Sequence, residues 1–273
     1  MKRFDAFFLT MREEERFCIL HRPADAQRAR GAVLFVHPFA EEMNRCRRMA
    51  ALQARAFADA GWTVLQMDLF GCGDSAGDFS AATWQAWLDD VVDASAWLRE
   101  KSGQRLAIWG LRAGCLLAAQ AVRRIEPAAD LVLWQPVSSG KQFLQQFLRL
   151  KLAAQLMSKE AGERTGTRQL REQLSRGEAV EIAGYTVSPE LALGLEGAEL
   201  EPPAAPARTA WLEVSAAAGA ELSPASRQRA ERWTQAGHDV EHRLVEGPLF
   251  WQTLDITEAP ALVDATLALT ERW

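Results

Sequence analysis

Two glycines that flank an arginine carry the clearest chemical signal in this 273-residue sequence. Residues 110–114 read Gly-Leu-Arg-Ala-Gly, after a short apolar run at residues 105–109 and before an alanine-rich helical stretch at residues 115–125. A buried strand, a G-x-S-x-G turn and a helix form a nucleophile elbow, which displays its central side chain for attack. Here the central residue is Arg112, and its frame consists of Gly110, Leu111, Ala113 and Gly114. Because guanidinium stays protonated and has no lone pair for attack, we expect the frame without its nucleophile.

The other members of a Ser-His-Asp site are also missing from their expected places. The histidine of such a site normally follows the last strand, but the turn after residues 240–245 reads Glu-Gly-Pro-Leu-Phe-Trp. His238 and His242 lie before or within that strand, so neither is expected to reach the site. The acid normally follows the strand at residues 209–214, where Glu221 is the only carboxylate in the loop. Glu221 is therefore either the acid or a solvated loop residue.

Three other residues are candidates for a catalytic role, namely Cys115, His37 and Glu41. Cys115 begins the helix behind the elbow, where the helix N-terminus and Arg112 would lower the pKa of a thiol. The alternative, which we favour, is a small buried residue that packs the helix against the sheet. His37 ends a strand and could act as a base. Glu41 and Glu42 could activate a water molecule, although adjacent side chains rarely point at one substrate.

A buried guanidinium needs a partner, because an unpaired buried charge is very costly. An internal partner is available, since Glu41 or Glu42 could form a bidentate pair with Arg112 and leave a closed, neutral relic; we favour this arrangement. An external partner is the alternative: a carboxylate or phosphate bound by Arg112 and by the backbone N–H groups of Ala113 and Gly114.

Apolar runs and helical stretches alternate along most of the chain, which predicts a mostly parallel sheet with helices on both faces. The runs at residues 32–36, 62–67 and 131–134 are continuous, as is typical of strands buried on both faces. Residues 4–10 and 15–22 mix charged with aromatic and apolar residues and predict an antiparallel hairpin at a sheet edge. The main helices are expected at residues 43–60, 84–100, 115–125, 224–236 and 260–272.

This alternation stops at residue 141. Residues 141–203 are largely helical and polar, with one short strand pattern near residues 180–183, and we expect them to form a cap inserted over the carboxyl edge of the sheet. The core is then divided into residues 1–140 and 204–273. Ligands of such sheets bind at the carboxyl ends of the strands. The expected pocket residues are His37, Phe39, Glu41, Glu42, Gln135, Phe250 and Trp251.

The composition excludes several function classes. A net charge of −5 argues against a nucleic-acid partner, and 48% apolar residues can fill one large core. The four cysteines form no C-x-x-C pair, so we expect no metal, no disulfide framework and no cofactor. The chain has neither a signal-peptide layout nor an apolar run long enough to span a bilayer, and we expect a cytoplasmic protein.

The motifs together resemble a known superfamily, the α/β hydrolases. The resemblance rests on His-Pro at residues 37–38, Asp-Leu-Phe-Gly-Cys-Gly-Asp-Ser at residues 68–75, and the elbow at residues 110–114. It implies an α/β-hydrolase fold, and it implies that His37 shapes the loop for an oxyanion.

The amino-acid sequences of four segments are similar to those of a narrower group, the exosortase A system-associated hydrolases of type 2. These segments are residues 37–44, 110–112, 134–137 and 247–253. The resemblance implies a bacterial PEP-CTERM and exopolysaccharide context, with a protein of that system or an anionic small molecule as partner. We therefore expect a pseudoenzyme that binds an anion or acts as a scaffold. The alternative is an active hydrolase that cleaves ester or thioester bonds with a different set of residues.

Overall fold

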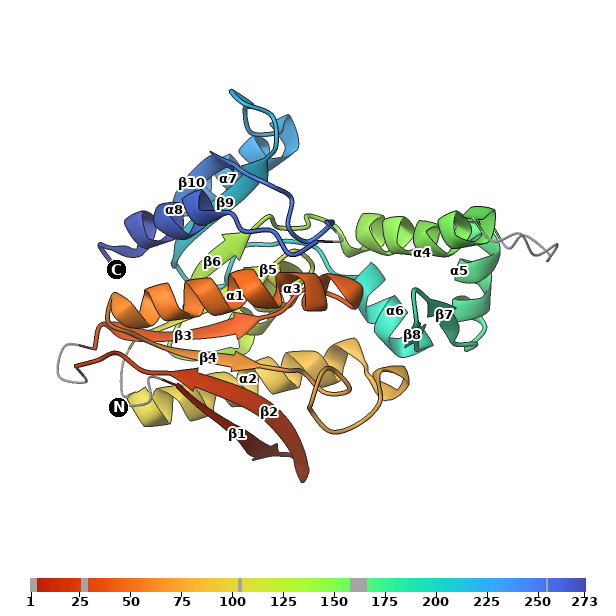
Figure 1. Ribbon diagram of the computed structural model, residues 1–273, viewed down its shortest axis with the longest axis horizontal. Helices are drawn as coiled ribbons and strands as arrows, with labels where there is room; N and C mark the ends of the chain where they lie inside the picture. Colours follow the sequence, from red (N-terminus) through yellow and green to blue (C-terminus); the bar gives the residue numbers. More distant parts are fainter. Residues whose placement is uncertain (1–3, 26–28, 103–104, 158–165, 254) are drawn as a thin grey trace.

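The computed structural model describes residues 4–25, 29–102, 105–157, 166–253 and 255–273. Its main sheet has eight strands in the order β1-β2-β4-β3-β5-β6-β9-β10 (Figure 1). The strands are β1 (Phe4–Met11), β2 (Glu14–His21), β3 (Gly31–Val36), β4 (Trp62–Met67), β5 (Leu106–Leu111), β6 (Asp130–Trp134), β9 (Arg208–Ser215) and β10 (Asp239–Glu246). Strands β4, β3, β5, β6, β9 and β10 are parallel to one another, whereas β2 pairs antiparallel with β4 and with β1. The predicted parallel sheet with an edge hairpin is confirmed.

Helices cover both faces of the sheet. They are α1 (Glu41–Asp59), α2 (Trp84–Ser102), α3 (Gly114–Ala121), α7 (Pro224–Gln235) and α8 (Pro260–Thr270), with short 3-10 turns η2 (Phe79–Ala81) and η3 (Val122–Arg124). One core cluster joins α1 and α8 to the sheet through residues such as Phe57, Trp109 and Leu262. The other lies on the opposite face, under α2 and α3. Every residue of β3, β5 and β6 is buried, which explains their uninterrupted apolar sequences.

The segment between β6 and β9 forms a separate layer beside the carboxyl ends of the strands (Figure 1). It contains α4 (Gly140–Met157), α5 (Thr167–Ser175), the hairpin β7 (Val180–Ile182) and β8 (Tyr185–Val187), and α6 (Pro189–Glu196). Ser188 fixes this layer to the core, because its hydroxyl donates a hydrogen bond to the carbonyl of Ala82 at 2.7 Å. Gly194 permits close packing on α2, since a Cβ there would lie 2.3 Å from Cβ of Trp84.

Several boundaries differ from those expected from sequence. The strand expected at residues 105–109 continues through Leu111, so the tight turn begins at Arg112 itself. The helix expected at residues 115–125 ends at Ala121, and η3 follows it. The single short strand expected near residues 180–183 is a hairpin.

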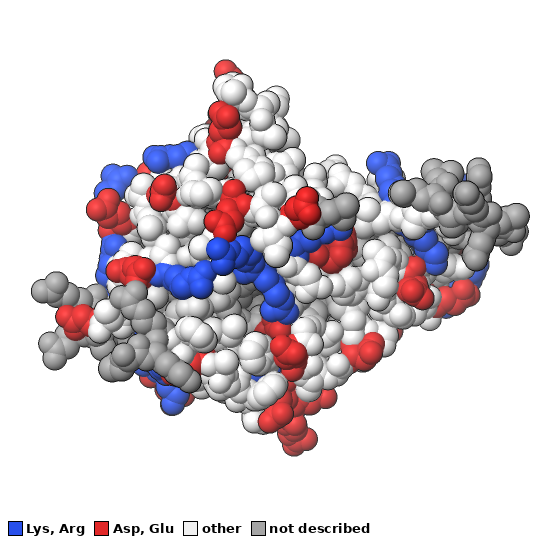
Figure 2. Space-filling view, in the orientation of Figure 1, with Lys and Arg blue, Asp and Glu red and all other residues white. Residues whose placement is uncertain are grey.

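The first helix begins at Glu41 rather than at residue 43. Glu41 and Glu42 therefore occupy the first turn of α1, where negative charge complements the helix dipole. Arginines follow along the exposed side of this helix, and Figure 2 shows them as a band of positive charge. No helix in the described ranges has the length and apolarity needed to cross a membrane.

Candidate functional site

The backbone at the elbow has the sharp geometry that its glycines predict. Arg112 stands between β5 and α3 with φ of 56°, in the left-handed region that non-glycine residues seldom adopt. A Cβ on Gly114 would lie 2.5 Å from the carbonyl oxygens of both Val36 and His37, and one on Gly110 would lie 2.7 Å from Cα of Cys115. The elbow is therefore packed directly against β3, and it displays Arg112 at the carboxyl edge of the sheet.

The Arg112 side chain is held by an internal acid. Its Nε donates a hydrogen bond to Oε1 of Glu42 at 3.2 Å. The Arg112 side chain is 14% exposed and that of Glu42 is 10% exposed, so the pair is largely shielded from water. The bidentate geometry expected from sequence is wrong: Nε makes the recorded contact, while Oε2 of Glu42 is buried and accepts no hydrogen bond within the described chain.

Two aromatic rings complete the enclosure of Arg112. The guanidinium carbon lies 5.4 Å from the ring centroid of Trp251 and 5.9 Å from that of Phe143, distances compatible with cation–π attraction. Trp251 comes from the turn after β10, where a hydrolase would carry its histidine, and Phe143 comes from α4. Phe143 was not among the pocket residues expected from sequence, because no local pattern places α4 over the elbow.

Burial dominates the electrostatics of Glu42. It raises the pKa of this carboxyl to about 7, although Arg112 acts in the opposite direction and the neighbouring Glu41 adds a smaller upward effect. Burial also raises the pKa of Glu41. Each glutamate has one buried Oε2 without a hydrogen-bond partner in the described ranges. The carboxyl pair is thus more easily protonated than surface glutamates.

Cys115 has none of the properties of a reactive thiol. It is completely buried, and its Sγ lies 3.5 Å from the carbonyl oxygen of Trp134. Burial raises its pKa far above the usual range and outweighs the opposing effect of Arg112. The lowered pKa considered from sequence is therefore wrong, because desolvation exceeds the contribution of the helix N-terminus.

His37 is occupied by two backbone contacts. Its Nδ1 lies 2.8 Å from the carbonyl oxygen of Pro38, and its Nε2 accepts a hydrogen bond from the backbone N–H of Leu69 at 3.3 Å. Burial lowers its pKa, which favours the neutral imidazole that this arrangement requires. His37 thus ties the loop after β3 to the loop after β4 and has no ring nitrogen left to serve as a base.

The remaining residues expected in the pocket have structural partners. Gln135, with φ of 44°, receives a hydrogen bond from Val214 N–H on its Oε1 at 2.7 Å and bridges β6 to β9. Phe39 packs edge-on against Phe143, Phe147 and Trp87.

Phe250 is buried between Trp134 and Trp251. Glu221 is 82% exposed and pairs with Arg227 at the start of α7, so the structure places it as a solvated residue rather than beside the elbow. The two histidines near the last strand also lie outside the site: His242 is exposed on β10, and His238 accepts a hydrogen bond from Ala207 N–H.

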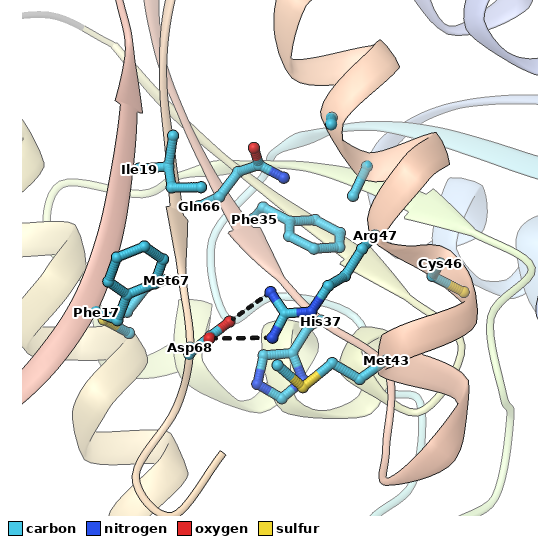
Figure 3. Close-up of a pocket in the computed structure, with 12 residues that line it drawn as sticks. Phe17, Ile19, Phe35, His37, Met43, Cys46, Arg47, Gln66, Met67 and Asp68 are labelled. Atoms are coloured by element: carbon cyan, nitrogen blue, oxygen red, sulfur yellow. Dashed lines mark hydrogen bonds and ion pairs between the residues drawn. The ribbon is translucent and has the colours of Figure 1, made fainter. Parts of the chain in front are cut away.

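A separate cavity of about 210 Å³ lies between α1 and the strands β2, β3 and β4 (Figure 3). Its polar end is formed by Arg47, which donates two hydrogen bonds to the carboxylate of Asp68 at 3.1 and 3.3 Å, with His37 and Gln66 nearby. Neither Arg112 nor Glu42 lines it. Arg47 and Asp68 lie 21 residues apart in the sequence, and only the fold brings them together.

Known structures share this architecture. Est1E from Butyrivibrio proteoclasticus, solved with ferulic acid bound, superposes with a TM-score of 0.68 at 11% identity, covering 98% of each chain. The α/β hydrolase GrgF from Penicillium sp. sh18 gives a TM-score of 0.62 at 16% identity, also covering 98% of each chain. XC6422 from Xanthomonas campestris, a serine hydrolase without a lid, gives a TM-score of 0.59 at 14% identity, with 100% of this chain and 96% of that chain covered.

At such low identity these neighbours show the fold alone, and that fold is the expected α/β-hydrolase fold. No curated protein matches the chain by sequence. A family model does match: residues 27–188, more than half of the chain, fit the family described as serine aminopeptidase, S33. These residues include β3, the elbow and the start of the inserted layer. The chain therefore belongs to this α/β-hydrolase family.

Proposed function

We propose that this protein is a pseudoenzyme of the hydrolase family that acts by binding an anion or by scaffolding. The ion pair between Arg112 and Glu42 carries the proposal. It fills the elbow with a charge that cannot attack a carbonyl, and it uses the guanidinium internally. Two of the residues considered as substitutes are not available, since His37 is engaged on both ring nitrogens and Cys115 is buried as a thiol.

The inserted residues 141–203 fit the role of a cap in this proposal. Phe143 in α4 covers the guanidinium from one side, and Trp251 covers it from another. A ligand that reached Arg112 would have to displace these rings and compete with Glu42. Protonation of Glu42 removes that competition, so an external carboxylate or phosphate is expected to bind better below pH 7.

The cellular context of the proposal comes from the sequence resemblance. The resemblance to exosortase A system-associated hydrolases of type 2 supports a role beside the PEP-CTERM and exopolysaccharide machinery, and we propose that the protein acts there in the cytoplasm. A protein of that machinery, or an anionic precursor handled by it, is the proposed partner. A closed, rigid elbow suits a scaffold because it presents a fixed surface and consumes no substrate.

Covalent labelling tests the absence of a nucleophile. Purified protein is treated with a fluorophosphonate and, in a separate sample, with iodoacetamide under native conditions, and intact masses are measured. We expect no fluorophosphonate adduct and no rapid alkylation of Cys115. A stoichiometric fluorophosphonate adduct would reject the proposal, and peptide mapping would identify the nucleophile.

A second candidate function is an unusual hydrolase for esters or thioesters. The observation in its favour is the pair of carboxyls with raised pKa, Glu41 and Glu42, next to a guanidinium that could polarise a carbonyl. In this mechanism one glutamate would take a proton from water as the water oxygen bonds to the acyl carbon. The acyl C–O or C–S bond would then break, and the protonated glutamate would return its proton to the departing alcohol or thiol. Turnover that is lost in both Glu41→Gln and Glu42→Gln would favour this candidate over the pseudoenzyme.

A further inference from the structure

The cavity under α1 is separate from the elbow and has a different chemistry. Eight of its lining residues are apolar or weakly polar: Phe17, Ile19, Phe35, Met43, Cys46, Ala50, Ala51 and Met67. Its volume of about 210 Å³ exceeds that of a cavity known to hold benzene, about 150 Å³. It can therefore accept a short alkyl segment or one substituted ring, and its walls offer such a group mainly dispersion contacts.

The wall of this cavity continues onto the exposed edge hairpin. Phe17 and Ile19 belong to β2, and their register partners on β1 are Phe8 and Ala6. The Phe8 ring packs against Phe17 with a centroid distance of 5.6 Å. Since side chains in a strand alternate between faces, Phe4 shares this face with Ala6 and Phe8.

None of the helices and strands that the structure describes covers these outer residues. The side of β1 that bears them is exposed along its length, with Phe4 51% and Phe8 53% accessible. An apolar strip, defined as Phe4, Ala6, Phe8, Phe17 and Ile19, thus leads from the cavity to the outer edge of the sheet. Large exposed apolar side chains arranged in this way are typical of a binding surface rather than of a solvated strand.

Positive charge borders the same strip. Arg47, Ala51 and Arg55 follow one another at intervals of four residues, so they lie on one side of α1. Arg47 and Ala51 line the cavity, and the charge of Arg55 contributes, after burial, to the lowered pKa of His21 on β2. In Figure 2 the band of Lys and Arg along α1 borders an uncharged area of the surface.

Both arginines retain hydrogen-bonding capacity. Arg47 is 44% exposed, and its two bonds to Asp68 use two of the five N–H groups of a guanidinium. Arg55 is exposed and forms no ion pair with the part of the chain that the structure describes. The border can therefore receive an anion without breaking the pair between Arg47 and Asp68.

We propose that this cavity binds a single-chain anionic amphiphile, that is, an alkyl chain with a carboxylate or a similar anionic head. The head group contacts Arg47 and Arg55, the adjoining carbons of the chain occupy the cavity, and the far end of a longer chain lies along the apolar strip. The combination of a cavity lined mainly by apolar side chains, an apolar path leading out of it and a cationic border on one side carries this assignment. It involves neither Arg112 nor Glu42, so it stands or falls separately from the proposed function.

Calorimetric titration with dodecanoate below its micellar concentration tests the proposal. Two control ligands are titrated in the same way. Acetate has the carboxylate head group but no alkyl chain, and dodecyltrimethylammonium has the same alkyl chain with a positively charged head group. We expect saturable 1:1 binding of dodecanoate, no binding of acetate, and affinity for the cation at least about tenfold weaker. Absence of saturable dodecanoate binding, or equal affinity for the cation, would overturn the proposal. Binding only to anionic vesicles would also overturn it, because it would indicate a membrane surface rather than a monomeric ligand.

Matched variants locate the site. Ala51→Phe fills part of the cavity and is expected to weaken the affinity for dodecanoate at least about tenfold. Ala56 is a half-buried residue of α1 outside the lining, so Ala56→Phe is expected to leave this affinity unchanged. Arg47→Gln is expected to weaken the binding of dodecanoate but not that of the cation. Arg48 pairs with Glu258 outside the cavity, so Arg48→Gln is expected to change the binding of neither ligand. If Ala51→Phe and Ala56→Phe, or Arg47→Gln and Arg48→Gln, changed the affinity for dodecanoate equally, the assignment of the site to this cavity would be wrong.

A surface variant avoids any effect on folding. Phe8→Ser is expected to weaken hexadecanoate more than octanoate, because only the longer chain reaches the strip. Leu193→Ser removes an equally exposed apolar side chain, also 53% accessible, from α6 and should affect neither ligand. If Phe8→Ser changed the affinity for both acids equally, or for neither, the proposed path of the chain would be wrong.

Discussion

Arg112 Nε and Glu42 Oε1 lie 3.2 Å apart and join the elbow to the first turn of α1. In a serine hydrolase the elbow position is occupied by a hydroxyl that must remain accessible to substrate. Here the same position carries one half of an ion pair, and both halves are largely buried. The pair therefore connects the elbow to α1, and in the proposed pseudoenzyme this connection replaces a reactive group.

The first prediction concerns the coupling between these two residues. Arg112→Met leaves Glu42 buried without its counter-charge and is expected to lower the free energy of unfolding at pH 8 by about 3–5 kcal/mol. Adding Glu42→Gln should restore a large part of that loss, because the buried charge is then removed. Urea unfolding of the wild type, both single variants and the double variant measures the coupling free energy. Additive effects of the two substitutions would show that the pair contributes nothing.

The second prediction concerns pH. Burial raises the pKa of Glu42 from 4.5 to about 7, so the folded state binds this proton more tightly than the unfolded state does. The contribution of Glu42 to stability is therefore fully present below pH 4.5 and is lost as the pH rises through 7, by up to about 3 kcal/mol. The difference in unfolding free energy between wild type and Glu42→Gln, measured from pH 5 to pH 8, should show this slope. A constant difference would contradict the raised pKa.

The third prediction concerns the elbow frame. Gly114→Ala places a methyl group 2.5 Å from two carbonyl oxygens of the β3 end, so backbone must move. We expect a loss of roughly 2 kcal/mol or more in the free energy of unfolding, as in other overpacked sites. Gly197→Ala is the matched control, since a Cβ there would lie an ordinary 3.5 Å from its nearest neighbour, the carbonyl oxygen of Leu193. Similar melting temperatures for the two variants would show that the elbow is not tightly packed against β3.

The fourth prediction concerns restoration of the nucleophile. Arg112→Ser recreates the G-x-S-x-G sequence but supplies no base, because Trp251 and Phe250 fill the turn where the histidine would stand. We expect no hydrolysis of p-nitrophenyl acetate or butyrate above that of the wild type. Robust activity from this single substitution would mean that an existing residue, with His37 the first to examine, can act as the base.

Much of the fold could be predicted because its determinants are local. The uninterrupted apolar sequence of β3 reports burial on both faces, and the mixed sequences of β1 and β2 report an edge hairpin. Gly110 and Gly114 indicate the elbow because any larger side chain would collide with neighbouring backbone. The missing histidine after β10 could also be read directly from the sequence.

The interior of the site was less predictable because it depends on distances between elements. Sequence placed two acids near Arg112 but could not show that Glu42 makes a single hydrogen bond, or that Phe143 from α4 lies over the guanidinium. For Cys115, the sequence reveals a helix N-terminus but not the complete desolvation that decides the thiol pKa. The cavity at Arg47 and Asp68 requires α1 and β4 to be placed side by side, which no local pattern specifies.

Steady-state turnover by the wild-type protein tests the central claim most directly. A panel of p-nitrophenyl esters and acyl thioesters, with acyl chains from two to twelve carbons, is measured at pH 6 and pH 8 against Glu42→Gln prepared in parallel. The pseudoenzyme account predicts that wild type and Glu42→Gln give the same background rate on every substrate. Saturable turnover by the wild type that disappears in Glu42→Gln would contradict it and would establish the elbow as a working hydrolytic site.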